Sequence, residues 1–117
     1  MNKPIDQKVL NALGLCAKAR RLITGTPMVC ESLRGAKKPF LVLCAADNSE
    51  NTAKKLKDKT AFYGVPLVTL SASGAILANA VGKRGGQVAA VAITDENFCR
   101  LITASLEQDR PKQTDTQ

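Results

Sequence analysis

Two amphipathic helices are predicted in the first third of the chain. Between residues 4 and 20, apolar residues recur every three or four positions, as they do on one face of a helix. A second helix is expected after Gly25, because Thr26 is a typical capping residue and Pro27 suits the first helical turn. Gly35 is expected to end this helix.

Apolar runs after each helix predict strands. Residues 40–44 (FLVLC) are apolar at every position, which favours a strand buried on both faces of a sheet. Residues 66–70 (PLVTL) predict a second short strand, and residues 88–93 (VAAVAI) another buried one. Leu22 and Ile23, just before the first glycine break, predict a shorter strand between the first two helices.

Three more helices are predicted between and after these strands. Asp47 and Glu50 have the spacing of a reciprocal cap, so a helix should start near Ser49 and end at Gly64. The side chains expected on its inner face are Ala53, Leu56, Thr60 and Tyr63. The lysines of residues 54–59 lie mainly elsewhere and could be either a phosphate-contacting flank or only a solvated face.

The last two helices surround a glycine-rich loop. Ser71 or Ser73 is expected to cap a small helix over residues 74–81, and Thr94 to cap a final helix over residues 95–107. The inward side chains of the final helix are expected to be Phe98, Leu101, Ile102 and Leu106. Residues 82–86 (GKRGG) are not a Walker loop, because no Ser or Thr follows the lysine and no strand precedes it.

The order of elements predicts an α/β fold. Helices alternate with strands along the whole chain, which is typical of a three-layer α/β/α sandwich on a central four-stranded mixed sheet. Residues 1–107 are expected to form a single domain, and residues 108–117 a polar, disordered tail.

The charge distribution points to a polyanionic partner. The 117 residues carry a net charge of +7. Residues 1–94 contain 14 Lys and Arg against 5 Asp and Glu, whereas residues 95–117 contain 3 against 5. A basic body with an acidic C-terminal part is typical of nucleic-acid binding, although a charge that serves only solubility is the alternative. Aromatic residues make up only 3%, which argues against a platform of stacked aromatic side chains.

The reactive side chains do not predict catalysis or metal binding. The four cysteines show no C-x-x-C spacing and there is no histidine, so neither a metal site nor a bound cofactor is expected. Free thiols in a reducing cytosol are favoured over disulfides. The chain has no apolar run long enough to span a membrane, so a cytoplasmic protein with no membrane partner is expected. No nucleophile elbow or carboxylate pair suggests an enzyme.

Five segments resemble a known family. They are LGLCAKARRLITG (13–25), FLVLCAADNSENTAKKLKDK (40–59), YGVPLV (63–68), LANAVGK (77–83) and VAITDENF (91–98). Together they resemble the L-seven-Ae ribosomal protein superfamily, in its bacterial YlxQ-like branch, over about residues 9–106. The resemblance implies an α/β/α sandwich that binds RNA, and in many members of the superfamily a kink-turn.

The residues with which the superfamily recognises a kink-turn are replaced here. Its pattern G-x-N-E-x-x-K matches at Gly25, but Pro27, Met28 and Glu31 occupy the Asn, Glu and Lys positions. Pro27 cannot donate a backbone hydrogen bond, and Glu31 would repel a phosphate. The resemblance therefore predicts the fold and RNA binding but not kink-turn specificity. The loop that covers a flipped-out base in the superfamily corresponds to residues 81–84.

Two functions remain open from the sequence. The first is a non-catalytic, monomeric RNA-binding protein whose helix start after Gly25 and basic loop contact structured RNA, ribosomal or other, in company with ribosome-associated proteins. The second is a protein-interaction module that uses the same face after losing RNA binding. The candidate RNA-binding residues are Arg21, Gly25, Thr26, Pro27, Met28, Arg34, Lys37, Val81, Gly82, Lys83 and Arg84.

Overall fold

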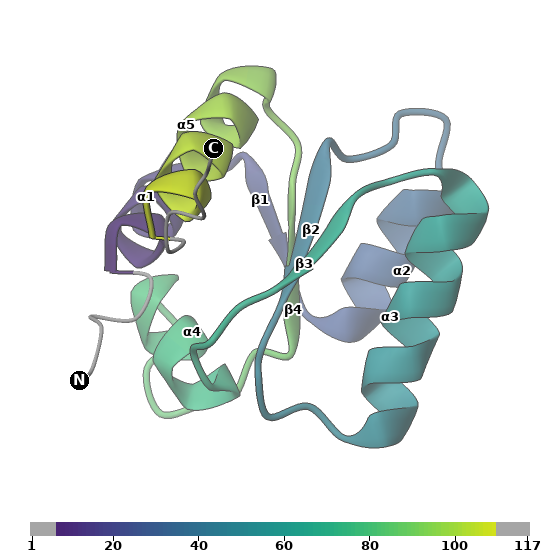
Figure 1. Ribbon diagram of the computed structural model, residues 1–117, viewed down its shortest axis with the longest axis horizontal. Helices are drawn as coiled ribbons and strands as arrows, with labels where there is room; N and C mark the ends of the chain where they lie inside the picture. Colours follow the sequence, from purple (N-terminus) through teal and green to yellow (C-terminus); the bar gives the residue numbers. More distant parts are fainter. Residues whose placement is uncertain (1–6, 110–117) are drawn as a thin grey trace, which may run out of the picture.

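The computed structural model describes residues 7–109, which form five helices and four strands in the predicted alternating order. The elements are α1 (Gln7–Lys18), β1 (Leu22–Thr24), α2 (Thr26–Arg34), β2 (Leu41–Cys44), α3 (Glu50–Tyr63), β3 (Leu67–Thr69), α4 (Gly74–Ala80), β4 (Ala90–Ile93) and α5 (Glu96–Asp109). The predicted α/β/α sandwich is confirmed: α1, α4 and α5 cover one face of the sheet, and α2 and α3 cover the other (Figure 1).

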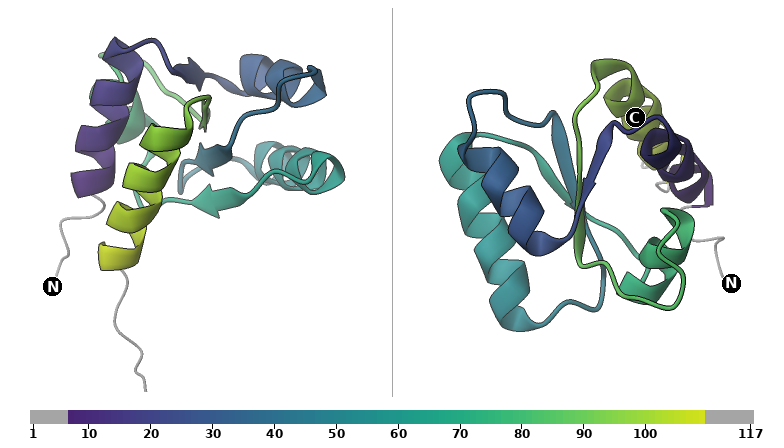
Figure 2. Two further views of the ribbon diagram at one scale, coloured as in Figure 1. Left: turned by 90° about the horizontal axis from the view of Figure 1, so that it is seen from above. Right: turned by 180° about the vertical axis from the view of Figure 1, so that it is seen from behind.

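The sheet is mixed and has the strand order β1-β4-β2-β3. The strand β4 lies in the centre and pairs antiparallel with both β1 and β2, whereas β2 and β3 are parallel. In the layer on the first face, α1 lies between α5 and α4: it runs beside α5 (Figure 2), and α4 lies along its other side.

The strand β2 shows why the sequence is apolar at every position of its run. In β2, Leu41 and Leu43 belong to the core beneath α1, α4 and α5, whereas Val42 and Cys44 belong to the core beneath α2 and α3. Successive side chains of a strand point to opposite faces, so a strand covered on both sides needs apolar residues throughout. Phe40, which the prediction included in this strand, precedes it and is 44% exposed.

The helices α2, α3 and α5 are each capped by a different residue from the one predicted. For α2 the capping position is Gly25, and the Thr26 side chain makes no capping hydrogen bond. For α3, Ser49 accepts from the backbone N–H of Thr52, while the Asp47 carboxylate instead accepts from the backbone N–H of Gly74, 2.8 Å away. Asp47 therefore joins the β2–α3 connection to the start of α4.

The remaining corrections concern α5 and two helix faces. Asp95, and not Thr94, caps α5 by accepting from the N–H of Phe98 at 3.0 Å. This helix extends to Asp109, so residues 108 and 109 do not belong to a tail, and residues 110–117 lie outside the described part. Leu101 is 46% exposed and Ala53 is also exposed, although both were expected to face inward. The predicted start of the first helix at residue 4 likewise lies outside the described residues.

Candidate nucleic-acid interface

The start of α2 is shaped by a glycine in a conformation that other residues rarely adopt. Gly25 has φ 96° and ψ 139°, and its N–H donates to the carbonyl of Ala90 at 2.9 Å, which ties the turn to the first residue of β4. Its own carbonyl accepts the first hydrogen bond of the helix, from the N–H of Val29. The helix therefore begins abruptly at the end of the sheet, with no side chain over its first turn.

The first turn of α2 offers few hydrogen-bond donors to a ligand. Within residues 7–109 no group accepts from the N–H of Thr26 or of Met28, and Pro27 has no N–H at all. Pro27 and Met28 are exposed, and the Met28 side chain is 58% exposed. Unpaired N–H groups and the partial positive charge of a helix start favour an anion, but here only two donors are available.

The loop between α4 and β4 carries two full positive charges. It turns through two glycines in the left-handed region, Gly82 with φ 87° and Gly85 with φ 82°. The N–H of Lys83 donates to the carbonyl of Ala78 at 2.8 Å, which fixes the loop to the end of α4. Lys83 and Arg84 thus lie between two glycine bends with their side chains exposed to solvent.

The loop and the start of α2 lie at the same end of the sheet. The loop continues through residues 85–89 to Ala90, the residue whose carbonyl accepts from Gly25, and Thr24 pairs with Val91 in the same ladder. The right-hand view of Figure 2 shows this end of the sheet from behind. Segments more than fifty positions apart in the sequence therefore lie at the same end of the sheet, and we call residues 25–28 with residues 82–84 the loop–helix surface.

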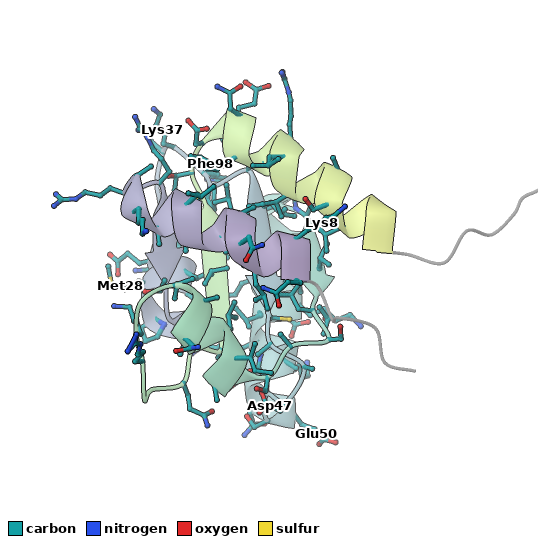
Figure 3. The ribbon with its side chains drawn as sticks, turned by 90° about the vertical axis from the view of Figure 1, so that its left-hand side faces the viewer. Lys8, Met28, Lys37, Asp47, Glu50 and Phe98 are labelled. Atoms are coloured by element: carbon teal, nitrogen blue, oxygen red, sulfur yellow. The ribbon has the colours of Figure 1, made fainter. Side chains whose placement is uncertain are left out.

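Three other predicted residues lie at the opposite end. The carbonyl of Arg21 accepts from the backbone N–H and the hydroxyl of Thr94, beyond the far end of β4. Arg34 ends α2, about 12 Å along its axis from Thr26. Lys37 follows α2 in the segment that enters β2 beside Ile93, and Figure 3 shows it well separated from Met28. The single positive surface expected from the sequence is thus divided into two groups.

Val81 is not available to a ligand in the way the sequence suggested. Its side chain is only 8% exposed and belongs to the core beneath α1, α4 and α5. Its N–H donates to the carbonyl of Leu77, which closes the last turn of α4. Val81 therefore supports the loop, and Gly82 is the first loop residue at the surface.

A groove between α1 and α4 adjoins the loop–helix surface. Its volume is about 770 Å³, and Arg84 and Lys18 both line it. Leu15 on α1 and Ile76 on α4 also line the groove and are about half exposed. The sequence analysis did not place Lys18 near the loop. The spacing of Asn11, Gly14, Leu15 and Lys18 could have indicated it, because this spacing puts the four residues on one side of α1.

The described residues show no arrangement suited to catalysis by a metal or a thiolate. In residues 7–109 no three His, Cys, Asp or Glu side chains lie close enough to hold a metal ion. All four cysteines are free thiols. Burial, and to a lesser extent the nearby Asp95 carboxylate, raises the pKa of the Cys16 thiol to about 11 despite the opposing charge of Arg21. A thiol with such a pKa is a poor nucleophile. None of the helices in this part of the chain is long and apolar enough to span a membrane.

The fold and its basic loop define a small α/β/α protein with an exposed helix start at one end of a mixed sheet. Residues 7–102 match the Ribosomal protein L7Ae/L30e/S12e/Gadd45 family, and the chain belongs to this family. Within the family it belongs to the YlxQ-like branch. It is 38% identical to the RNA-binding protein YlxQ of Bacillus subtilis over 95 residues, which cover 81% of this chain and 91% of that protein.

Other relatives agree with this assignment. The RNA-binding protein YlxQ of Enterococcus faecium is 41% identical over 83 residues, which cover 71% of this chain and 79% of that protein. A Bacillus halodurans protein of unknown function has a similar structure, with a TM-score of 0.76, 31% identity, and coverage of 86% of this chain and 97% of that one. None of these descriptions is that of an enzyme, in agreement with the prediction from the sequence.

A more distant structure shows the fold alone. The Giardia lamblia 15.5kD RNA binding protein superposes with a TM-score of 0.74 at 18% identity, over 93% of this chain and 90% of that one. The sandwich is therefore kept while most side chains change. The predicted loss of kink-turn specificity concerns side chains, and so it stays a prediction.

Proposed function

We propose that this protein is a non-catalytic RNA-binding protein that holds structured RNA against the loop–helix surface. Two findings support RNA as the ligand. The curated relatives in its branch are named RNA-binding proteins. Lys83 and Arg84 are exposed at the same end of the sheet as a helix start whose Thr26 and Met28 N–H groups have no acceptor within residues 7–109. The observation that carries the proposal is the hydrogen bond from Gly25 to Ala90, because it brings these two segments to one end of the sheet.

The chemistry of the surface favours phosphate contacts over base recognition. Exposed lysine and arginine side chains neutralise phosphates without reading sequence. The positions next to Gly25 that could contact a base edge hold proline and methionine, neither of which has a polar side chain group for it. We therefore expect RNA binding that is sensitive to salt and only weakly selective for sequence. We also propose that the protein works in the cytoplasm.

The test compares charge changes inside and outside the loop–helix surface. A labelled RNA hairpin with an internal loop is titrated with the full chain at several salt concentrations. The double variant Lys83→Gln/Arg84→Gln should bind more weakly and reduce the slope of log affinity against log salt by about 1.8, the value for two phosphate contacts. The control Lys57→Gln/Arg100→Gln removes the same charge from α3 and α5 and should leave that slope unchanged. Equal effects of the two double variants would refute the proposed surface.

Glu31 provides a second test with the opposite sign. This exposed carboxylate lies one turn along α2 from Met28 and, within the described residues, forms no ion pair. Glu31→Gln removes a negative charge near the proposed phosphate and should raise affinity. A change in the other direction would show that the acidic side chain contacts the ligand itself.

Kink-turn specificity is tested with a matched pair of RNAs. One contains the tandem sheared G·A pairs of a kink-turn, and the other has the same stems with those pairs replaced. A specific base contact contributes about 1–3 kcal/mol, and the chain lacks the side chains for it. The two affinities should therefore differ by less than about 5-fold. A larger preference for the kink-turn would show that the family specificity survives the substitutions.

A protein-interaction role for the same face is the second candidate function. The observation in its favour is Met28, whose apolar side chain is 58% exposed beside Pro27. Capture of partners from lysate, with and without nuclease treatment, separates the two functions. A partner that remains after nuclease treatment and is lost in Met28→Ser favours the protein-interaction role.

A further inference from the structure

The outer surface of α3 carries an exposed aromatic ring at the end of a row of lysines. Lys55, Lys59 and Phe62 follow one another at intervals of four and three residues, so they lie along one stripe of the helix. Phe62 is 80% exposed, the largest exposure among the large apolar side chains of the described residues. The low aromatic content had argued against stacking on such a ring, yet the structure places this phenylalanine in solvent.

The two lysines of this stripe form no ion pair with the side chains described in residues 7–106. On the adjacent part of α3, Lys54 and Asp58 form an ion pair with 2.9 Å between nitrogen and oxygen, so each offsets the charge of the other. By contrast, no acidic oxygen of residues 7–106 lies within 4.0 Å of the ammonium group of Lys55 or Lys59. The stripe therefore offers two uncompensated positive charges.

At the aromatic end of the stripe, the Phe62 ring contacts its neighbour Tyr63. The Phe62 ring packs edge to face against Tyr63, with 4.9 Å between ring centroids. On Tyr63, in turn, the ammonium group of Lys38 lies 5.0 Å from the ring centroid, while it donates to the carbonyl of Gly35. Tyr63 and Lys38 thus join the end of α3 to the segment after α2. Phe62 keeps most of its ring surface free for a planar partner.

We propose that this stripe is a second RNA-contacting surface, which binds an unpaired segment of single-stranded RNA. One base stacks on the Phe62 ring, and the neighbouring phosphates bind Lys55 and Lys59. An aromatic ring beside a cationic row is the usual means of holding a single strand without reading its sequence. An acidic protein segment would satisfy the lysines but would gain no stacking on the ring.

This surface is separate from the loop–helix surface. The loop of Lys83 and Arg84 extends from α4, which covers the face of the sheet opposite to α3 (Figure 1). The helix α2 packs beside α3, but Phe62 contacts Tyr63 and, through it, the Lys38 segment that follows the end of α2, whereas residues 25–28 lie at the start of α2. A variant of one surface therefore leaves the other unchanged. The proposal rests on the residues of α3 and does not depend on the proposed function of the loop.

The experiment uses the full chain and a short, fluorescein-labelled oligouridylate, which forms no stems. Phe62→Leu keeps apolar bulk but removes the ring, and it should weaken binding between about 5-fold and 150-fold, the range for loss of one stacked base. Phe62→Tyr keeps the ring and should bind as the unmodified chain does. Because the side chain is largely in solvent, both variants should fold, which circular dichroism checks.

The lysines are tested by the salt dependence of the same titration. Lys55→Gln/Lys59→Gln should reduce the slope by about 1.4, the value for two phosphates of a single strand. Lys57→Gln is the matched control, because Lys57 lies on the opposite flank of α3 and should leave the slope unchanged. An iodouridine-substituted probe should crosslink to Phe62 on irradiation, and the crosslink should be absent in Phe62→Leu.

The outcomes distinguish this proposal from the proposed function. If Phe62→Leu binds the oligouridylate normally and no crosslink forms, the second surface is refuted, whatever the loop variant does. If Lys83→Gln/Arg84→Gln leaves hairpin binding unchanged while Phe62→Leu weakens oligouridylate binding, the loop–helix surface is refuted and the α3 surface is supported. If polyglutamate binds with the same dependence on Phe62, the surface accepts acidic protein and the RNA assignment is overturned.

Discussion

Replacement of Gly25 by alanine should destabilise the fold through the backbone alone. Its φ of 96° and ψ of 139° lie in a region that residues with a Cβ rarely adopt, at a cost of about 1–3 kcal/mol. A Cβ added at this position would have no atom within 4 Å, so no steric clash contributes. With an unfolding entropy of about 0.25 kcal/mol per degree for a chain of this size, a cost of about 2 kcal/mol lowers the melting temperature by about 8 °C.

The assay for Gly25→Ala is thermal and urea unfolding followed by circular dichroism, because the chain has no tryptophan. Gly64→Asn is the control. Gly64 has φ 71° and ψ 29°, a left-handed conformation that asparagine tolerates, and it too has open space at Cβ. It should therefore lose less stability than the Gly25 variant. A melting temperature for Gly25→Ala within about 2 °C of the unmodified chain would refute the backbone explanation for this turn.

Three further substitutions test other parts of the structure. Arg20, in the turn that follows α1, has φ 61°, so Arg20→Gly should raise the free energy of unfolding by about 1 kcal/mol in urea titrations, and a loss would contradict this. The Asp47 carboxylate accepts from Gly74, so Asp47→Ala should cost about 1–2 kcal/mol and Asp47→Asn less; equal costs would show that this hydrogen bond is unimportant. The Cys16 thiol, with its pKa raised from 9.0 to about 11, ionises later in the folded chain than in the unfolded one. Stability should therefore fall by roughly 2 kcal/mol between pH 9 and pH 11, and Cys16→Ala should lack this part of the decrease in urea titrations at each pH.

The sandwich could be predicted from the sequence because its strongest signals are local. The strand β2 reads as a run of apolar residues, and the structure buries that run on both faces of the sheet. Gly64 follows the last turn of α3 and adopts the expected left-handed conformation. The sequence was less informative about which of two neighbouring polar residues caps a helix. Thr94 and Asp95 are both good capping residues, and only the position of the helix in the fold selects Asp95.

The layout of the candidate site could be predicted only in part because it depends on strand pairing. The central position of β4 places Gly25 beside Ala90 and the carbonyl of Arg21 beside Thr94, at the two ends of one short strand. Register and strand order arise from contacts between distant segments, and periodicity within one segment does not contain them. The prediction that Arg21 and Lys83 share a surface had no such information. The Gly25 turn and the loop lie at the same end of the sheet, and their shared role in RNA binding stays a prediction.

The balance of charges at the loop–helix surface indicates which part of it holds the ligand. The start of a helix contributes about half a unit of positive charge, and Pro27 leaves only the N–H groups of Thr26 and Met28 free in the first turn. The loop contributes two full charges from Lys83 and Arg84, and Glu31 subtracts one. Since the loop outweighs the helix start, we expect the proposed phosphate contact to be made mainly by these two side chains and less by the backbone donors. We also expect binding of this kind to tolerate changes in the shape of the RNA, in line with the predicted loss of kink-turn specificity.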